Sequence, residues 1–192
     1  MIGDRWGVTD DEVARHYPCD DIVPSPILQA WRGVTVRVLP DELWPWVAQI
    51  RLAPYSYDWI DNLGRRSPQE LQALPEPAAG QHFSTAAATR RLGRILSVSP
   101  GEQITGRIAG AVMSYVLAPE GDETRLLLKI VTARGRLIAP LLSVGDFVMA
   151  RRQLLNLKGL AEQPRATTLV CTRRRTHTTR VVTRSLCSAA ET

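Results

Sequence analysis

The segment Arg125 to Thr132 constrains the fold of this 192-residue chain more than any other. Its side chains are apolar on both alternating faces, with Lys129 as the exception inside the run. A strand of this kind is typical of an interior place in a sheet, since a strand with one solvated face alternates apolar and polar residues. The segment therefore predicts a central strand of an antiparallel sheet.

Shorter segments with the two-residue period of β-strands supply its neighbours. Val34, Val36 and Val38 alternate with Thr35 and Arg37, which indicates a half-buried strand. Three more strands are expected in residues 91–98, 103–108 and 112–117, with turns at 100–101 and 120–123.

Helix signals lie before and between these strands. Thr9 and Glu12 form a capping box, which indicates a short helix that ends before Pro18. Pro40 is well suited to the first turn of a second helix, which is expected to continue to about Leu52. A third short helix is expected in residues 58–63, and a turn or short helix in residues 67–70.

A long amphipathic helix is the last expected element. Ser143 and Asp146 form a second start signal that resembles a capping box, so the helix is predicted to begin there. Its apolar side must lie on a large apolar surface, and only the sheet is large enough. The apolar residues at helical spacing are Phe147, Ala150, Leu154, Leu157 and Ala161.

The formal charge of +5 is confined to the end of the sequence. Residues 164–192 hold six arginines and one glutamate, so of the 24 basic and 19 acidic side chains 18 of each kind remain in residues 1–163. A neutral body lacks the positive surface that strong nucleic-acid binding requires. Nucleic acid is therefore an expected partner only of this tail, which has few large apolar groups and is predicted to be disordered.

Composition also indicates a soluble cytoplasmic protein. No run approaches the roughly 18 consecutive apolar residues of a membrane helix, and the first residues lead into polar sequence. The cysteines are odd in number and widely spaced, which argues against a disulfide framework. Cys171, His177 and Cys187 are the one conceivable zinc cluster, but no metal and no other cofactor is expected.

Aromatic and polar side chains concentrate in residues 55–68. The segment contains three aromatic residues, two carboxylates, one asparagine amide and two guanidinium groups, and Trp44 and Trp46 precede it by about ten residues. This concentration indicates a ligand-facing wall.

The order of strand, helices, several strands and long helix resembles the SRPBCC superfamily, the START, polyketide cyclase and pollen-allergen-like proteins with the helix-grip fold. The resemblance covers about residues 17–163 and is carried by residues 34–38, 43–49, 124–126 and 147–155. The runs Tyr17-Pro18-Cys19-Asp20, Tyr55-Ser56-Tyr57-Asp58-Trp59 and Asp61-Asn62-Leu63-Gly64-Arg65-Arg66 are similar to a bacterial branch without an assigned activity.

The resemblance implies an α+β helix-grip fold, in which a curved antiparallel sheet wraps around a long C-terminal helix and two short helices follow the first strand. This domain is expected in residues 31–163, after an N-terminal extension with a short helix in residues 1–30. The family also implies an internal, mostly apolar cavity. The expected function is therefore binding of a hydrophobic or aromatic small molecule, either lipid or polyketide-like.

Candidate ligand-binding residues come from the inward faces of this fold and from the segment 55–68. For those on strands and long helices, the alternative is core packing. The polar ones either orient a ligand at the cavity mouth or fasten the loop, by pairing Asp58 or Asp61 with Arg65 or Arg66. The candidates are Trp44, Trp46, Tyr55, Tyr57, Asp58, Trp59, Asp61, Asn62, Arg65, Arg66, Met113, Tyr115, Leu117, Phe147 and Leu154.

A polyketide cyclase or aromatase-like enzyme is the alternative to a binding protein. Its catalysis would use Tyr57 or Tyr115 as an acid and Asp58 as a base in a dry pocket. The sequence contains no nucleophile elbow, Walker loop, dinucleotide fingerprint or zinc-protease motif. A non-enzymatic ligand binder is therefore favoured, and nucleic-acid binding by the arginine-rich tail is the second alternative.

Overall fold

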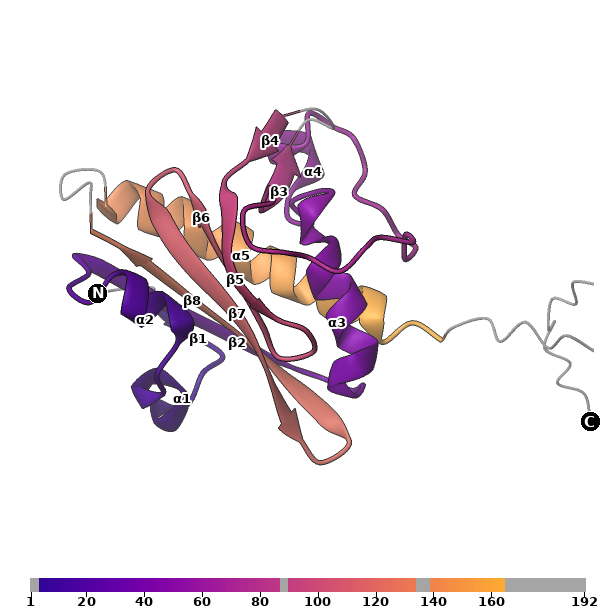
Figure 1. Cartoon of the computed structure of the whole chain (residues 1–192), viewed down its shortest axis with the longest axis horizontal. Coiled ribbons are helices and arrows are strands. Elements are labelled where there is room, and N and C mark those ends of the chain that lie inside the picture. The colour runs from indigo at the N-terminus through magenta and orange to yellow at the C-terminus, as the bar shows by residue number, and fades with distance from the viewer. Residues whose placement is uncertain (1–3, 87–89, 134–138, 165–192) are drawn as a thin grey trace, which may run out of the picture. The chain divides into compact units, whose positions relative to one another are not determined.

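The computed structural model describes residues 4–86, 90–133 and 139–164; the side chains of Asp61 and of residues 139–147 are outside the described part. The chain divides into a compact unit Met1–Glu162 and a second unit Gln163–Thr192, each considered by itself. Of the predicted tail, residues 165–192 lie outside the described residues. All helices and strands named below belong to the first unit (Figure 1).

A six-stranded open sheet forms the centre of this unit, in the order β1-β2-β8-β7-β6-β5. β8 pairs antiparallel with both β2 and β7, which confirms the predicted central strand. The sheet is mostly but not wholly antiparallel, because β1 runs parallel to β2. The strands are β1 (Arg5–Trp6), β2 (Leu28–Val36), β5 (Arg94–Ser99), β6 (Gln103–Ile108), β7 (Ala111–Glu120) and β8 (Glu123–Thr132).

Two predicted strands have different bounds. The strand expected at residues 34–38 is β2, which begins at Leu28 and ends at Val36. Its first half is buried on both sides and so lacks the alternation that reveals a strand. The single strand expected at residues 91–98 is divided at Gly93 into β4 (Arg90–Leu92) and β5.

Gly93 causes this division by its backbone conformation. Its φ is +65°, and a Cβ atom there would lie 2.1 Å from the carbonyl oxygen of Arg107. Only glycine allows both the positive φ and this close approach. The chain therefore leaves the main sheet, and β4 pairs with β3 (Ser84–Ala86) in a separate two-stranded sheet.

The helices after β2 are close to the prediction. α3 (Pro40–Ala48) begins at Pro40 and continues as the 3₁₀ helix η1 (Gln49–Arg51), near the expected end at Leu52. α4 (Asp58–Asp61) is a single turn. Residues 67–70 form no helix and bend only at 69–70, because Asp58 bonds to the backbone of Ser67 and Gln49 to that of Glu70.

The long helix α5 (Ala139–Ala161) begins before the predicted start. The interpretation of Ser143 and Asp146 as a capping box is wrong, since both lie inside the helix and Pro140 stands in its first turn, where proline is favoured. The apolar face is otherwise as expected, since Ala150, Leu154, Leu157 and Ala161 are buried. The side chain of the remaining predicted residue, Phe147, lies outside the described part.

The two faces of the sheet carry separate apolar clusters, as the alternation along β7 predicted. Tyr115 and Leu117 belong to the cluster shared with α3 and α5. Val112 and Val116 point the other way, toward a cluster that includes Tyr17 and Cys19 of the N-terminal segment. The N-terminal extension is therefore a second layer over the sheet rather than an appendage.

This N-terminal layer consists of α1 (Asp10–Ala14), which has the predicted capping box, and α2 (Pro18–Ile22), which was not predicted. It also explains Lys129, the one polar residue between Leu126 and Val131 of the central strand. Lys129 forms an ion pair with Asp20, and its ammonium group lies 5.4 Å and 5.1 Å from the ring centroids of Tyr17 and Trp31. Burial in the same layer raises the pKa of the Cys19 thiol to about 11.

Gly106 of β6 offers a test of the packing on the face of the sheet that α3 and α5 cover. A Cβ atom there would lie 2.1 Å from the ring of Phe83, so Gly106→Ala should lower the free energy of unfolding by about 1–3 kcal/mol through overpacking. Gly159→Ala is the matched control, since a Cβ at this exposed helical position meets nothing within 4 Å. It should raise stability by up to about 1 kcal/mol. Urea unfolding of both variants checks this, and equal stabilities would contradict the described packing.

Candidate functional site

A cavity of about 230 Å³, partly open to solvent, lies between the sheet and the elements that cover it. β6, β7 and β8 supply one wall and α5 the opposite one. η1, the start of the segment after α3, and the β3–β4 hairpin complete it. The described lining residues are Ile50, Pro54, Ser56, Phe83, Ser84, Ala86, Leu92, Ile108, Met113, Tyr115, Leu128, Ile130, Met149, Ala150 and Gln153.

The hairpin wall is held in place by packing and by hydrogen bonds to η1. The Phe83 ring lies over Gly106 and 6.2 Å from the Tyr115 ring, measured between centroids. The hydroxyl groups of Ser84 and Thr85 donate to the carbonyl oxygens of Ile50 and Arg51, at 3.0 Å and 2.7 Å. Because both bonds attach the hairpin to η1, they fix where the hairpin lies over the sheet.

The lining is apolar except for four hydroxyl or amide side chains, and none of its described residues is charged. The phenol of Tyr115 donates to Gln153 Oε1 at 2.5 Å, and Gln153 Nε2 donates to the carbonyl oxygen of Pro54 at 2.6 Å. Gln153 thus links the central sheet to the segment that follows α3. The Tyr115 phenol and the Gln153 amide therefore place hydrogen-bonding groups in a mainly apolar lining.

Residues 54–68, which we call the strap, cross the end of the cavity and contain α4. Asp58 holds the strap closed: its carboxylate accepts from the backbone N–H of Ser67 at 2.7 Å and from the Ser67 hydroxyl at 2.5 Å. Asn62 Nδ2 donates to the carbonyl oxygen of Arg65 at 2.7 Å. Asp58 is therefore held by Ser67 rather than by Arg65 or Arg66, and the pairing expected of Asp61 involves a side chain outside the described part.

Buried amide side chains fasten the strap to the helices. Gln49 Nε2 donates to the Tyr55 hydroxyl at 2.6 Å, and Asn156 Nδ2 donates to the carbonyl oxygens of Tyr55 and Ser56. Burial, opposed in part by the Gln49 bond, raises the pKa of Tyr55 to about 12. Tyr55 also has a φ of +55°, a strained conformation that these contacts maintain.

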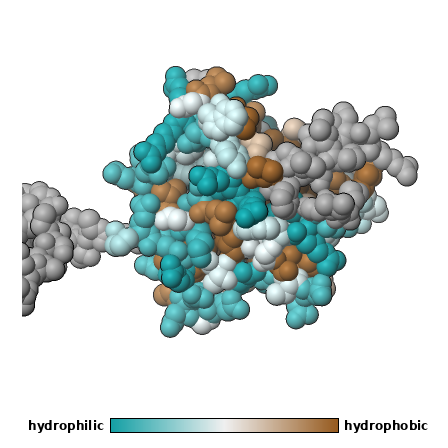
Figure 2. Space-filling view, turned by 180° about the vertical axis from the view of Figure 1, so that it is seen from behind, coloured by the Kyte–Doolittle hydropathy of each residue, from teal (hydrophilic) through white to brown (hydrophobic). Residues whose placement is uncertain are grey.

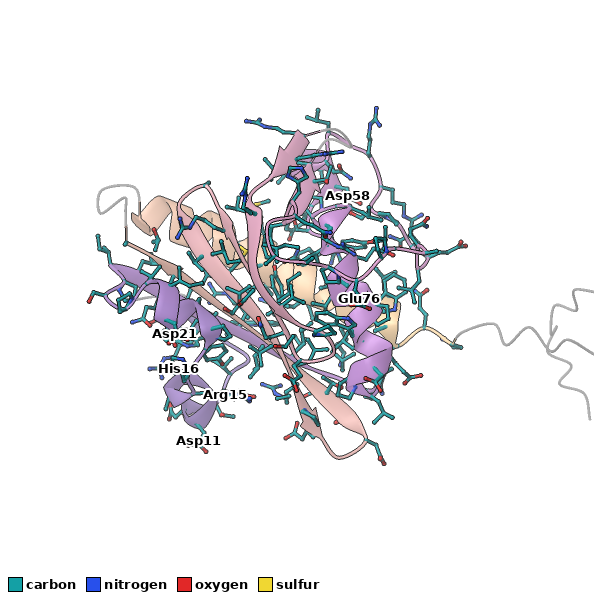
Figure 3. The ribbon with its side chains drawn as sticks, viewed as in Figure 1. Asp11, Arg15, His16, Asp21, Asp58 and Glu76 are labelled. Atoms are coloured by element: carbon teal, nitrogen blue, oxygen red, sulfur yellow. The ribbon has the colours of Figure 1, made fainter. Side chains whose placement is uncertain are left out.

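The loop after the strap is fastened to the same helices. Gln49 bonds to the carbonyl of Glu70 and accepts from the N–H of Gln72. Trp44 Nε1 donates to Glu76 at 3.0 Å, and Figure 3 labels Glu76 beside α3, below Asp58. Buried backbone groups need such partners, and here side chains provide them in place of a regular ladder.

The predicted site residues separate into three groups. Met113 and Tyr115 line the cavity. Trp44, Trp46, Tyr55, Leu117 and Leu154 are buried in the core beside it, and Asn62 is buried in the strap. Trp59, Arg65 and Arg66 are exposed, whereas Tyr57, whose ring lies 5.8 Å from the Arg152 guanidinium carbon, and Asp58 are half-buried. The side chains of Asp61 and Phe147 lie outside the described part.

Sequence reasoning missed the residues that organise the site, Gln49, Phe83, Gln153 and Asn156. A signal was present for two of them. Gln153 and Asn156 stand at i and i+3 between the apolar positions of α5, so two amides border its apolar stripe. Phe83 gave no such signal, because it lies outside any periodic segment.

Comparisons with known proteins bear on the fold. A scan against models of protein families gives no match. No curated protein matches the sequence. Among solved structures, SSP2350 from Staphylococcus saprophyticus has a TM-score of 0.51 at 9% identity, over 71% of this chain and 92% of that one. MLL2253 from Mesorhizobium loti has a TM-score of 0.47 at 18% identity, over 69% and 95%.

A third solved structure is DynU16, described as a putative protein in the dynemicin biosynthetic locus, with a TM-score of 0.42 at 14% identity over 68% of this chain and 47% of that one. At these identities the likeness concerns the fold. A mostly antiparallel sheet with a long C-terminal helix fits a helix-grip fold in general terms. In the described ranges, no helix is long and apolar enough to cross a membrane, and no cluster of three metal-binding side chains occurs.

The Asp58–Ser67 contact yields a stability prediction. Asp58→Ala should lower the free energy of unfolding by about 1.5–3 kcal/mol, because it removes two hydrogen bonds to a charged group. In the double variant, the loss of unfolding free energy should be smaller than the sum of the losses in Asp58→Ala and Ser67→Ala, since the two residues interact. Urea unfolding of the single and double variants measures this coupling.

Asp122→Ala is the control, at an exposed turn position, and should change stability by less than about 0.5 kcal/mol. If Asp58→Ala were as stable as the unchanged protein, or if the two effects were fully additive, Asp58 would not fasten the strap.

Proposed function

We propose that this chain is an SRPBCC-like helix-grip protein that binds a small, uncharged, mainly apolar molecule in this cavity. The observation that supports this most is the lining, in which eleven apolar residues surround four uncharged polar ones, among them the bonded pair Tyr115 and Gln153. Ligand sites commonly combine an apolar wall with a few polar groups that orient the ligand.

The volume sets the size of the ligand. A dry apolar cavity of about 150 Å³ accommodates one benzene molecule, and drug-sized ligands occupy about 300–1,000 Å³. The cavity of about 230 Å³ lies between these values and suits a bicyclic aromatic compound or a molecule of similar size. Of the two expected ligand types, an extended acyl lipid is therefore disfavoured relative to a compact aromatic one.

The chemistry of the lining sets the charge of the ligand. A carboxylate or an ammonium group in this space would lose its hydration without gaining an opposite charge from any described lining residue. A hydroxyl or carbonyl group, in contrast, can bond to the Gln153 amide, whose two N–H donors and two acceptor lone pairs exceed the bonds that it makes with Tyr115 and Pro54. We therefore infer a neutral ligand with one polar atom.

Binding is favoured over cyclase chemistry by the positions of the acid and base candidates. The carboxylate of Asp58 is engaged by Ser67, and neither Asp58 nor Tyr57 is among the residues that line the cavity. Tyr115 does line it, but general acid–base catalysis also requires a partner base within hydrogen-bond reach of the substrate. Nucleic-acid binding by the tail is a separate hypothesis, because residues 165–192 lie outside the described part.

Binding of 2-naphthol tests the proposal. It should bind the protein and raise the melting temperature, and Ala150→Phe, which fills the cavity from α5, should abolish both effects. Leu155→Phe is the matched control, since Leu155 is on the same helix but exposed. Isothermal titration calorimetry with 2-naphthol, naphthalene and palmitate measures the affinities.

Tyr115→Phe should weaken 2-naphthol by about two- to tenfold and leave naphthalene unchanged, which corresponds to the loss of one hydrogen bond. Palmitate should bind more weakly than either aromatic compound. The proposal fails if neither aromatic compound binds, or if Ala150→Phe binds them as well as Leu155→Phe does.

A further inference from the structure

The strap carries an exposed apolar tip formed by Trp59, Ile60 and Leu63. Their side chains remain 73%, 50% and 76% exposed, although large apolar side chains are normally covered. Trp59 and Ile60 belong to α4, and Leu63 follows it at a positive φ of 51°. The fold thus holds three large apolar groups outward in one short segment, a sign of an interaction surface.

Exposed arginines lie around this tip. Arg65 and Arg66 are in the strap, directly after the tip, and Arg90, Arg91 and Arg94 are on the β3–β4 hairpin and the start of β5. The strap and the hairpin border the same cavity, and Figure 1 shows α4, β3 and β4 at one end of the sheet. At that upper end, Figure 2 shows apolar residues beside hydrophilic ones.

Two regions of the body differ in net charge. Residues 54–94 hold five arginines and four acidic residues, a net charge of +1. Residues 9–22, which contain α1 and α2, hold five acidic residues and one arginine, a net charge of −4. Figure 3 labels Asp11 and Asp21 in this N-terminal layer, away from Asp58 of the strap. The part of the chain that carries the tip is therefore weakly positive, and the N-terminal layer is negative.

We propose that the tip docks on an anionic lipid bilayer. Tryptophan is favoured at the boundary between headgroups and acyl chains, and leucine and isoleucine gain by entering the acyl region. Arginines beside an inserted group bind lipid phosphates, and each basic residue near an anionic surface strengthens binding by roughly fivefold. The acidic layer of α1 and α2 then faces away from the membrane, which fixes the orientation.

A second copy of the chain fits this surface less well. In a two-fold symmetric dimer the same patch meets itself, so Arg65 and Arg66 would approach their own counterparts. A bilayer offers anionic groups to these arginines and an apolar layer to the tip. The proposal does not depend on ligand binding, although a docked tip would bring the wall of the cavity to the membrane.

Vesicle binding of the full chain tests this proposal. The chain should co-sediment with vesicles of phosphatidylcholine and phosphatidylserine and bind weakly to pure phosphatidylcholine vesicles. The double change Trp59→Ser and Leu63→Ser should weaken binding at least about tenfold, because two buried apolar groups are lost. Leu39→Ser, at a 50% exposed leucine outside the tip, should bind like the unchanged chain.

The tail requires its own control, since basic residues alone also attract anionic vesicles. Changing Arg173, Arg174 and Arg175 to glutamine should reduce binding but leave the effect of the tip variant unchanged. Tryptophan fluorescence then reports insertion directly. Trp31, Trp44 and Trp46 are buried and Trp6 is half-buried, so the Trp59→Phe variant, which still binds, identifies the source: a blue shift that comes from Trp59 should vanish in it.

The proposal is overturned if the tip variant binds vesicles like the unchanged chain while the tail variant does not bind. It is also overturned if the chain binds vesicles without a blue shift. Concentration-dependent dimerisation that the tip variant abolishes, with no vesicle binding, would instead assign the surface to a second copy and equally overturn it. Because 2-naphthol binding is measured without vesicles, failure of the docking proposal and failure of the cavity proposal are distinguishable.

Discussion

The width of the sheet is the constraint on which the rest of the structure depends. Six strands spaced about 4.8 Å apart span roughly 24 Å, whereas an α-helix is only about 10 Å wide. One long helix therefore cannot cover the apolar face of this sheet alone. α3, η1, the strap and the β3–β4 hairpin cover the remainder, and the cavity lies where these elements and α5 meet over the central strands. On the opposite face, the N-terminal helices provide the cover.

Covering a sheet with irregular chain creates a second requirement, because loops bring backbone N–H and C=O groups into dry surroundings. Here three buried or half-buried amides meet it. Gln49 holds Tyr55 and the loop at residues 70–72, Gln153 holds Pro54, and Asn156 holds Tyr55 and Ser56. The polar residues of the strap, Asp58 above all, are likewise occupied with their own chain. The strap is rich in residue types that often catalyse reactions, but its polar groups mainly form hydrogen bonds within the chain. It lies beside a cavity whose described lining residues are uncharged.

Much of the architecture could be predicted because it depends on short-range physical preferences. The central strand, the turn at residues 120–123, the capping box and the helix at Pro40 each follow from alternation or from end signals. The misses have a different origin. β1 and the first half of β2 lack the alternation that reveals a strand. The break at Gly93 results from its contact with Arg107. α5 begins at Ala139, beside Pro140, ahead of the more conspicuous start signal at Ser143 and Asp146. The cavity residues Met113 and Tyr115 were predicted from the strand face, whereas Phe83 and Gln153 require knowledge of which distant segments meet.

The central claim is that the fold forms a mainly apolar cavity between the sheet, α5 and the start of the strap. The most direct measurement is a crystal structure of the protein under xenon gas, since xenon enters dry apolar cavities of this size. A xenon atom should be found between Phe83, Met113 and Ala150, in contact with their carbon atoms. Side chains that fill this space, or ordered waters bound there in place of xenon, would contradict the claim.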